Sequence, residues 1–164
     1  ALHEFARRSY ATIAAEFPFL RALAVPGSIG ENISSSGLTD STVCIGDTYR
    51  IGQVIVQVSQ PRKPCWKINH RFKAENLSVF IEQRQVTGWY YRVLEAGSIT
   101  AGDQIILLER LNEAITVAYF IQHVMQHRPD PDELNSLIEC QYLNAQWKAK
   151  FKARRKYLAS LVER

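Results

Sequence analysis

The sequence predicts a mainly β protein with additional α-helix: a β-barrel domain followed by a small domain of three helices. Several short segments alternate apolar and polar residues with turns between them, which is typical of the strands of a barrel. The composition changes near Leu111, and from there apolar residues recur at helical spacing. We therefore expect the barrel domain over residues 1–110 and the helical domain over residues 111–164.

The expected strands are short and separated by turn residues. In the clearest one, Val54, Val56 and Val58 alternate with Ile55, Gln57 and Ser59, which is the period of a half-buried strand. The pair Gly46-Asp47 predicts a tight turn between two further strands. By the same reasoning, the predicted strands are 43–45, 48–51, 54–59, 89–94 and 104–108.

Helices are expected before, within and after these strands. Residues 1–16 form the first, because Leu2, Phe5, Ile13 and Phe17 can share one apolar face, and Pro18 ends it. The others are 76–85, 116–126, 131–140 and 144–162. Thr116, Asp130 and Asn144 are expected to cap the last three, with Pro131 at a first helical position. In the final helix the predicted apolar face is Trp147, Phe151, Leu158 and Leu161.

Composition and cysteine usage limit the class of protein. The chain is 164 residues long and 46% apolar, enough for one globular domain with a small addition. No apolar run approaches the roughly 20 residues that a membrane span needs, and no signal peptide opens the chain. The three cysteines are widely spaced, which indicates free thiols in a reducing compartment. We therefore expect a cytoplasmic protein that does not bind a membrane.

The stretch with the most chemistry runs from Val58 to Lys67. Within ten residues it holds one cysteine, Cys65, two prolines that precede it, and three cations, Arg62, Lys63 and Lys67. Prolines restrict the backbone, so the thiol is held in place, and the cations favour the thiolate electrostatically. These facts fit a metal ligand or nucleophile, but they fit equally well a buried structural cysteine beside a solvated loop. Cys44, inside an apolar run, is read as part of the core.

The residues around this stretch resemble a known family. Val43-Cys44-Ile45-Gly46-Asp47, then Val58-Ser59-Gln60-Pro61-Arg62 with Pro64-Cys65, are similar to the MOSC domain, the C-terminal domain of molybdenum cofactor sulfurases. Gly30-Glu31-Asn32-Ile33 and Gly88-Trp89-Tyr90-Tyr91-Arg92-Val93 continue the similarity. The sequence looks most like the bacterial YiiM-type branch, in which a small helical domain follows the barrel. That branch carries several strands before this point, so we expect the opening strands of the barrel to be missing here.

The resemblance implies a molybdenum cofactor (molybdopterin) with Cys65 as the ligand of the metal. It places Asn32 near the pterin and phosphate, while Arg62, Lys63 and Lys67 are the cations expected to bind the phosphate. The implied reaction is the reduction of N-hydroxylated compounds, such as hydroxylaminopurine or amidoximes. Since the sequence has no Gly-x-Gly-x-x-Gly fingerprint, we expect an external flavoprotein-type electron donor. Pyridoxal phosphate binding is not expected.

Other metal and catalytic arrangements are disfavoured. The cysteines lack the paired spacing of zinc sites, and no glutamate follows His123 in its pair with His127, so a zinc-protease helix is excluded. No Ser-His-Asp or paired-carboxylate pattern supports a hydrolase.

Two alternatives from other classes stay open. Cys65 could carry a persulfide in a sulfur or cofactor carrier module. The basic final helix, with Lys148, Lys152 and Arg155, could bind nucleic acid, although a solvated amphipathic helix is the preferred interpretation. A homodimer is also left open.

Overall fold

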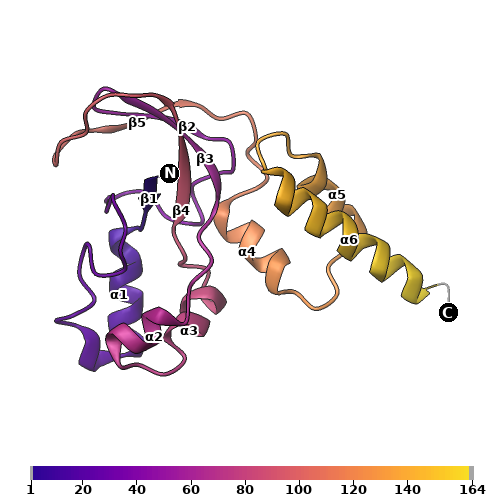
Figure 1. Ribbon diagram of the computed structural model, residues 1–164, viewed down its shortest axis with the longest axis horizontal. Helices are drawn as coiled ribbons and strands as arrows, with labels where there is room; N and C mark the ends of the chain where they lie inside the picture. The colour runs from indigo at the N-terminus through magenta and orange to yellow at the C-terminus, as the bar shows by residue number, and fades with distance from the viewer. Residues whose placement is uncertain (1, 163–164) are drawn as a thin grey trace.

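A five-stranded antiparallel sheet with helices on both sides organises this computed structural model, which describes residues 2–162 (Figure 1). The strand order is β1-β4-β3-β2-β5. The strands are β1 (Leu2–Glu4), β2 (Thr48–Ile51), β3 (Val54–Pro61), β4 (Trp89–Glu95) and β5 (Ile105–Glu109). The helices are α1 (Arg7–Glu16), η1 (Pro18–Leu20), α2 (Lys67–Phe72), α3 (Leu77–Gln83), α4 (Val117–Met125), α5 (Pro131–Glu139) and α6 (Ala145–Val162).

The sheet is open within the described residues. Strand β1 pairs with β4 and strand β5 with β2, so these two strands form the opposite edges of the sheet. The prediction of a closed barrel is therefore not confirmed, and a mixed α/β fold replaces it. Alternation correctly marked strands β2 to β5, but it carries no information on whether a sheet closes.

Two expected elements differ from the structure. Residues 2–4 form strand β1, paired with Tyr91, Tyr90 and Trp89, where a helix over 1–16 was expected. Strand pairing outweighs the helical spacing there, and the helix begins at Arg7. Residues 43–45 form no strand, only an isolated bridge between Cys44 and Thr116. Residue 1 of the expected first helix and residues 163–164 lie outside the described part.

The helix caps that were predicted in the C-terminal part are confirmed. The side chains of Thr116, Asp130 and Asn144 accept hydrogen bonds from Tyr119 N (3.0 Å), Asp132 N (2.7 Å) and Trp147 N (2.9 Å). On α6, Phe151 is buried and Trp147 and Leu158 are half-buried, while Leu161 is exposed and departs from the predicted face.

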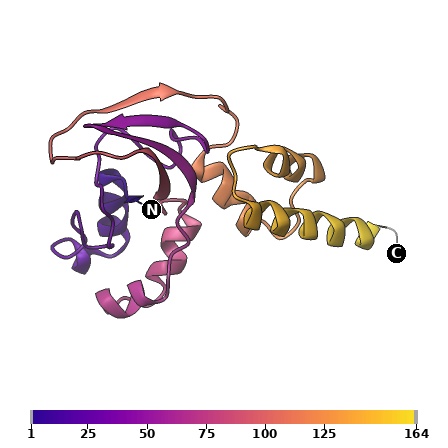
Figure 2. The same cartoon turned by 45° about the horizontal axis from the view of Figure 1, so that its top comes forward.

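The main core runs from the sheet into the C-terminal helices. Buried Tyr49 and Trp89 of the sheet belong to the same apolar cluster as Phe120 of α4, Leu134 of α5 and Phe151 of α6. Figures 1 and 2 show α4 between the sheet and the α5–α6 pair. The division at residues 110/111 stays a prediction, but the apolar packing crosses it.

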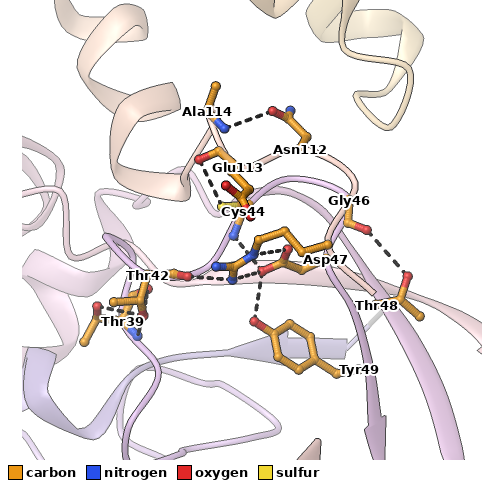
Figure 3. A network of polar contacts seen from close by, with 11 residues as sticks. Thr39, Thr42, Cys44, Gly46, Asp47, Thr48, Tyr49, Asn112, Glu113 and Ala114 are labelled. Atoms are coloured by element: carbon orange, nitrogen blue, oxygen red, sulfur yellow. Dashed lines mark hydrogen bonds and ion pairs between the residues drawn. The ribbon is translucent and has the colours of Figure 1, made fainter. Parts of the chain in front are cut away.

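A buried ion pair ties the end of β5 to the turn before β2. Asp47 accepts from Cys44 N and Tyr49 Oη, both at 2.9 Å (Figure 3), and from Arg110 Nη2 at 2.6 Å. Because all these donors surround it, the buried carboxylate is well satisfied. Cys44 is buried here, with its Sγ 3.7 Å from Glu113 O, so its assignment to the core is confirmed.

A second apolar cluster holds the helices at the other side of the sheet. It contains Phe5 and Ile13 from the N-terminal segment, Ile68 and Phe72 from α2, and Ile81 from α3. Helix α2 was not anticipated from the sequence, since it spans six residues and no side chain caps it. Within residues 2–162, no helix combines the length and the apolar character that crossing a membrane requires.

Candidate functional site

The candidate site lies on the loop that joins β3 to α2. Backbone hydrogen bonds fix both ends of this loop: Arg62 N donates to Gly88 O (3.0 Å), and Ile68 N donates to Cys65 O (2.9 Å). Ile68 is buried, so the first turn of α2 anchors the second end. The loop is therefore held from β4 on one side and from the second apolar cluster on the other.

The side chains that the loop presents are free of acidic partners. The Cys65 thiol is exposed, as are Lys63 and Lys67, while Arg62 is half-buried. The ion pairs found among residues 2–162 are Arg110–Asp47 and His123–Glu133, so none of the three cations near Cys65 is neutralised by a carboxylate. The alternative that Cys65 is a buried structural cysteine does not match its exposure.

Arg62 joins the loop to the segment before β2. Its Nη1 donates to Ile29 O at 3.0 Å and lies 3.4 Å from His3 Nδ1. Burial, and then the positive charge of Arg62, lower the pKa of His3 to about 4, so the imidazole is neutral near pH 7. A neutral ring can accept the Arg62 proton at Nδ1, which places its own proton on Nε2.

Asn32 is exposed, but its side-chain oxygen is already engaged. Its Oδ1 accepts from His3 N at 2.8 Å, and the main-chain N–H groups of Asn32 and Ile33 both donate to His3 O. Asn32 thus binds the main chain of strand β1, while its amide N–H₂ donates to no group within the described part of the chain. The structure therefore brings Asn32, His3 and Arg62 together, with Cys65 three residues further along the loop from Arg62.

Hydrogen bonds to Glu31 stabilise the turn that carries Asn32. Its Oε1 accepts from Tyr10 Oη, Gly27 N (2.6 Å) and Ser34 Oγ (2.6 Å). Burial alone would raise the pKa of Glu31, but these donors, led by Ser34 and Tyr10, lower it overall. Glu31 is consequently a structural carboxylate of this turn.

Sequence reasoning missed two buried polar residues beneath the loop, His3 and Asp40. Asp40 Oδ1 accepts from Gly88 N (2.8 Å) and Thr87 Oγ1 (3.2 Å), and burial raises the pKa of Asp40 to about 6. Gly88 has φ +71°, and a Cβ there would lie 2.3 Å from Glu4 O. Asp40 and this close approach fix Gly88, whose carbonyl then holds Arg62.

A third buried carboxylate, Glu4, lies next to His3 on β1. It accepts from Tyr91 Oη at 2.6 Å and from Ser35 Oγ. Burial is the main cause that raises the pKa of Glu4 above its usual range. The motif Gly88-Trp89-Tyr90-Tyr91 indicated strand β4, but the role of Tyr91 as a donor inside the domain had no signal in the sequence.

Two cavities flank the candidate site. One of about 490 Å³ is lined by Asn32 and Ser34 together with residues of the 99–105 loop. The other, a hollow of about 530 Å³, lies beside Trp66 and is lined also by Asn69, His70 and Lys73. Cys65 lines neither of these two cavities.

The donor set fits a molybdenum cofactor better than a zinc ion. A single exposed thiolate suits a soft metal that another sulfur ligand already holds. Groups of three or more metal-binding side chains, which a protein-bound zinc would need, are not found among residues 2–162. Buried His3 Nε2 has no hydrogen-bond partner in this part of the chain, and the unpaired cations of the loop suit an anionic phosphate.

Two other candidates from the sequence have structural explanations. His123 is buried between Tyr119 O (2.8 Å) and Glu133 Oε2 (2.9 Å), whereas His127 is exposed. On α6, Arg154 donates to the main-chain oxygens of His123 and Val124 at the end of α4, and so part of the basic stripe stabilises a helix end.

Comparison with known sequences points to one family. A profile of the MOSC domain matches residues 1–106. Protein YiiM of Escherichia coli (strain K12) is 34% identical over 161 residues, covering 94% of this chain and 69% of that protein. Uncharacterized protein YflK of Bacillus subtilis (strain 168) is 34% identical over 124 residues, covering 76% and 56%. A protein named Reductase from Gibberella moniliformis (strain M3125 / FGSC 7600) is 38% identical over 144 residues, covering 87% and 25%.

Solved structures agree with this assignment. The crystal structure of YiiM from Escherichia coli superposes with a TM-score of 0.89 at 32% identity, covering 96% of this chain and 78% of that one. For YiiM from Geobacillus stearothermophilus the TM-score is 0.87 at 30% identity, covering 94% and 78%. The chain thus spans about 70% of the length of Escherichia coli YiiM, just over half of YflK and a quarter of Reductase. It is a YiiM-type member of the MOSC family.

Proposed function

We propose that this chain carries the molybdenum cofactor site of a reductase that acts on N-hydroxylated compounds. The observation that carries the proposal is the exposed thiol of Cys65 on a backbone-anchored loop whose cations have no carboxylate partner among residues 2–162. The similarity to a protein named Reductase supports an oxidoreductase, although this chain spans a quarter of that protein.

The loop residues and Asn32 would each bind a different part of such a cofactor. Cys65, as thiolate, would be the protein ligand of the metal. Lys63 and Lys67 would supply positive charge for the phosphate, and Arg62 would offer it the guanidinium N–H groups that Ile29 and His3 leave free. Asn32 would contribute its amide N–H₂, since its oxygen is bound to His3 N.

The overall reaction is a two-electron reduction. A hydroxylamine R–NHOH takes up two electrons and two protons, its N–O bond breaks, and R–NH₂ and water leave. The cofactor supplies the redox chemistry when bound, and the protein positions it and the substrate. An external flavoprotein-type donor supplies the electrons in this proposal.

The decisive experiment combines metal analysis with turnover. We expect the full-length protein, purified from a host that makes the cofactor, to contain molybdenum and molybdopterin and to reduce hydroxylaminopurine and an amidoxime with reduced methyl viologen. Cys65→Ser should abolish turnover while thermal unfolding stays unchanged. Cys140→Ser, which alters a buried cysteine of the C-terminal part, is the matched control and should remain active.

The alternative is a sulfur or cofactor carrier in which Cys65 bears a persulfide, because an exposed thiolate also suits that chemistry. Sulfur released by cyanide from a protein free of molybdenum, and lost in Cys65→Ser, would support the carrier and reject the reductase. Full activity of Cys65→Ser with viologen would remove Cys65 from either role.

A further inference from the structure

The surface beside the candidate site carries an unusual charge distribution. Between Arg62 and Lys73 the chain has five arginine or lysine residues and no carboxylate. Apart from Cys65, the exposed residues of this stretch form what we call the α2 face: Lys63, Trp66, Lys67, His70, Arg71 and Lys73. None of its cations belongs to an ion pair within residues 2–162.

The stability of helix α2 accounts for only part of this arrangement. Lys67 and Arg71 are four residues apart on the same helix, where like charges repel. Lys67 also lies at the N-terminal end, where the helix dipole disfavours a cation, whereas Arg71 lies in the last turn, where the dipole favours one. Ile68 and Phe72, both buried, hold the helix in place against these costs. Helix stability thus leaves Lys67 unexplained, and Lys63, which lies outside the helix, has no carboxylate partner within residues 2–162, so a partner outside the chain explains these two cations better than the fold does.

An exposed aromatic side chain lies within the α2 face. Trp66 has 68% of its surface exposed, whereas Trp89 is fully buried. The hollow of about 530 Å³ beside Trp66 is lined by His70, Lys73 and Asn76 among others. A large exposed aromatic residue beside a depression and surrounded by charged residues is typical of a protein–protein interface with one anchoring residue.

The α2 face is also close to the thiol. Trp66 directly follows Cys65, and a helix of six residues is only about 9 Å long. Because Ile68 N donates a hydrogen bond to Cys65 O, the main chain of Cys65 is attached to the first turn of the helix. A partner bound on the α2 face would thus lie against the loop that presents Cys65.

We propose that the α2 face is the docking site of an acidic electron-carrier protein, a proposal that rests on the proposed function. Each N–O bond reduced consumes two electrons, which the carrier loses and the substrate gains. An acidic surface complements the unpaired cations and would be steered to them, which typically raises association rates 10- to 1,000-fold at low salt. The docked carrier would deliver its electrons at the position of Cys65.

The test compares two electron sources in variants of the full-length protein. Arg71→Glu with Lys73→Asp reverses two charges and spares Lys63 and Lys67, which are assigned to the cofactor. Aspartate is chosen because residue 73 has a left-handed φ of 49°. The matched control is Lys152→Glu with Lys156→Glu, two exposed cations of α6, on the arm of the molecule away from α2 in Figures 1 and 2.

With reduced flavodoxin as the acidic probe, we expect the α2 variant to lose at least tenfold in second-order rate at low ionic strength. The wild-type rate should fall as salt is added. With reduced methyl viologen, a small donor that needs no docking, the α2 variant should equal the wild type. The α6 variant should equal the wild type with both donors.

Equal losses in the α2 and α6 variants would mean that only the overall charge matters, and would overturn the proposal. An unchanged flavodoxin rate, or a parallel loss with viologen, would also overturn it. A 20-nucleotide RNA that binds the wild type and not the α2 variant, with flavodoxin rates unchanged, would assign the face to nucleic acid instead. If the wild type is inactive with viologen, the proposed function fails, and direct binding of flavodoxin to the two variants then decides the docking site.

Discussion

Replacing Asp40 with asparagine should change how the stability of this protein depends on pH. Asp40 Oδ1 accepts from Gly88 N and Thr87 Oγ1, and its Oδ2 is buried with no partner among the described residues. Asparagine keeps an acceptor for Gly88 and removes the buried charge. The substitution therefore isolates the cost of ionising a carboxyl group that the fold encloses.

The sign follows from proton binding. Burial raises the pKa of Asp40 from 3.8 to about 6, so between these values the native state binds a proton that the unfolded state has lost. The contribution of Asp40 to the free energy of unfolding is fully present below pH 3.8. It falls as the pH rises and is lost above pH 6. The difference corresponds to about 3 kcal/mol at pH 7.

His3 acts in the opposite direction over almost the same range. Burial and Arg62 lower its pKa from 6.5 to about 4, so the unfolded state binds the extra proton there. Its contribution is complete above pH 6.5 and falls by about 3 kcal/mol as the pH drops to 4. In the wild type the two contributions largely cancel between pH 4 and 6.

Urea unfolding followed by circular dichroism at half-unit steps from pH 4 to 8 measures the effect. The difference in unfolding free energy between Asp40→Asn and wild type should shift in favour of the variant by about 3 kcal/mol as the pH rises from 4 to 7. His3→Gln is the matched control and should shift in the opposite direction. If the difference between Asp40→Asn and wild type is the same at pH 4.5 and pH 7, Asp40 is not a costly buried carboxylate, and this reasoning is wrong.

Three further substitutions test the support of the site. Gly88→Ala would place a methyl group 2.3 Å from Glu4 O and should destabilise the protein by about 1–3 kcal/mol more than Gly102→Ala. Gly102 is the control because it also has a positive φ but has open space around it. Similar losses of melting temperature in the two variants would contradict this expectation. Phe120→Ala should cost about 3–5 kcal/mol in one cooperative transition, because its core is shared with the sheet, and two separate transitions would show independent domains. Arg62→Ala should strongly lower the molybdopterin content of the purified protein with little change in its melting temperature, and Arg62→Lys should be intermediate. Unchanged molybdopterin content would exclude Arg62 from binding the cofactor phosphate.

The strands were predictable from the sequence because their alternation reflects burial on one face. Residues 54–61 and 89–95 form strands where Val54, Val56 and Val58, and Trp89 with Tyr91, are buried. The pattern does not predict burial where the face is not covered: Val93 continues the alternation of Trp89 and Tyr91 but is 47% exposed. Alternation gives the orientation of a residue but not what packs on it, so an open sheet could not be told from a barrel.

The site was predictable only where its residues are adjacent in sequence. The loop with Arg62 and Cys65 could be identified because prolines, cations and a thiol occur within ten residues. His3 and Asp40 could not, because their roles depend on Gly88, which is more than 45 residues away from each. Residues 2–4 also fit a helical pattern, which concealed the strand that carries His3. Long-range pairing decides both cases, and no local spacing records it.

The three cysteines of this chain show why the loop is better explained by binding than by packing. Cys44 and Cys140 are buried, with their sulfur atoms in contact with Glu113 O and Asn112 Nδ2, as expected of structural thiols. At Cys65 the backbone is bonded at both ends of the loop while the thiol faces solvent. Fixing a loop backbone adds little to the stability of the fold when the side chains of the loop stay exposed. A ligand site, by contrast, needs both a fixed backbone and exposed side chains, since preorganised groups lose less entropy on binding. The same reasoning predicts that Cys65 should react with a thiol reagent far faster than Cys44 in the folded protein, and equal rates would place Cys65 in the interior.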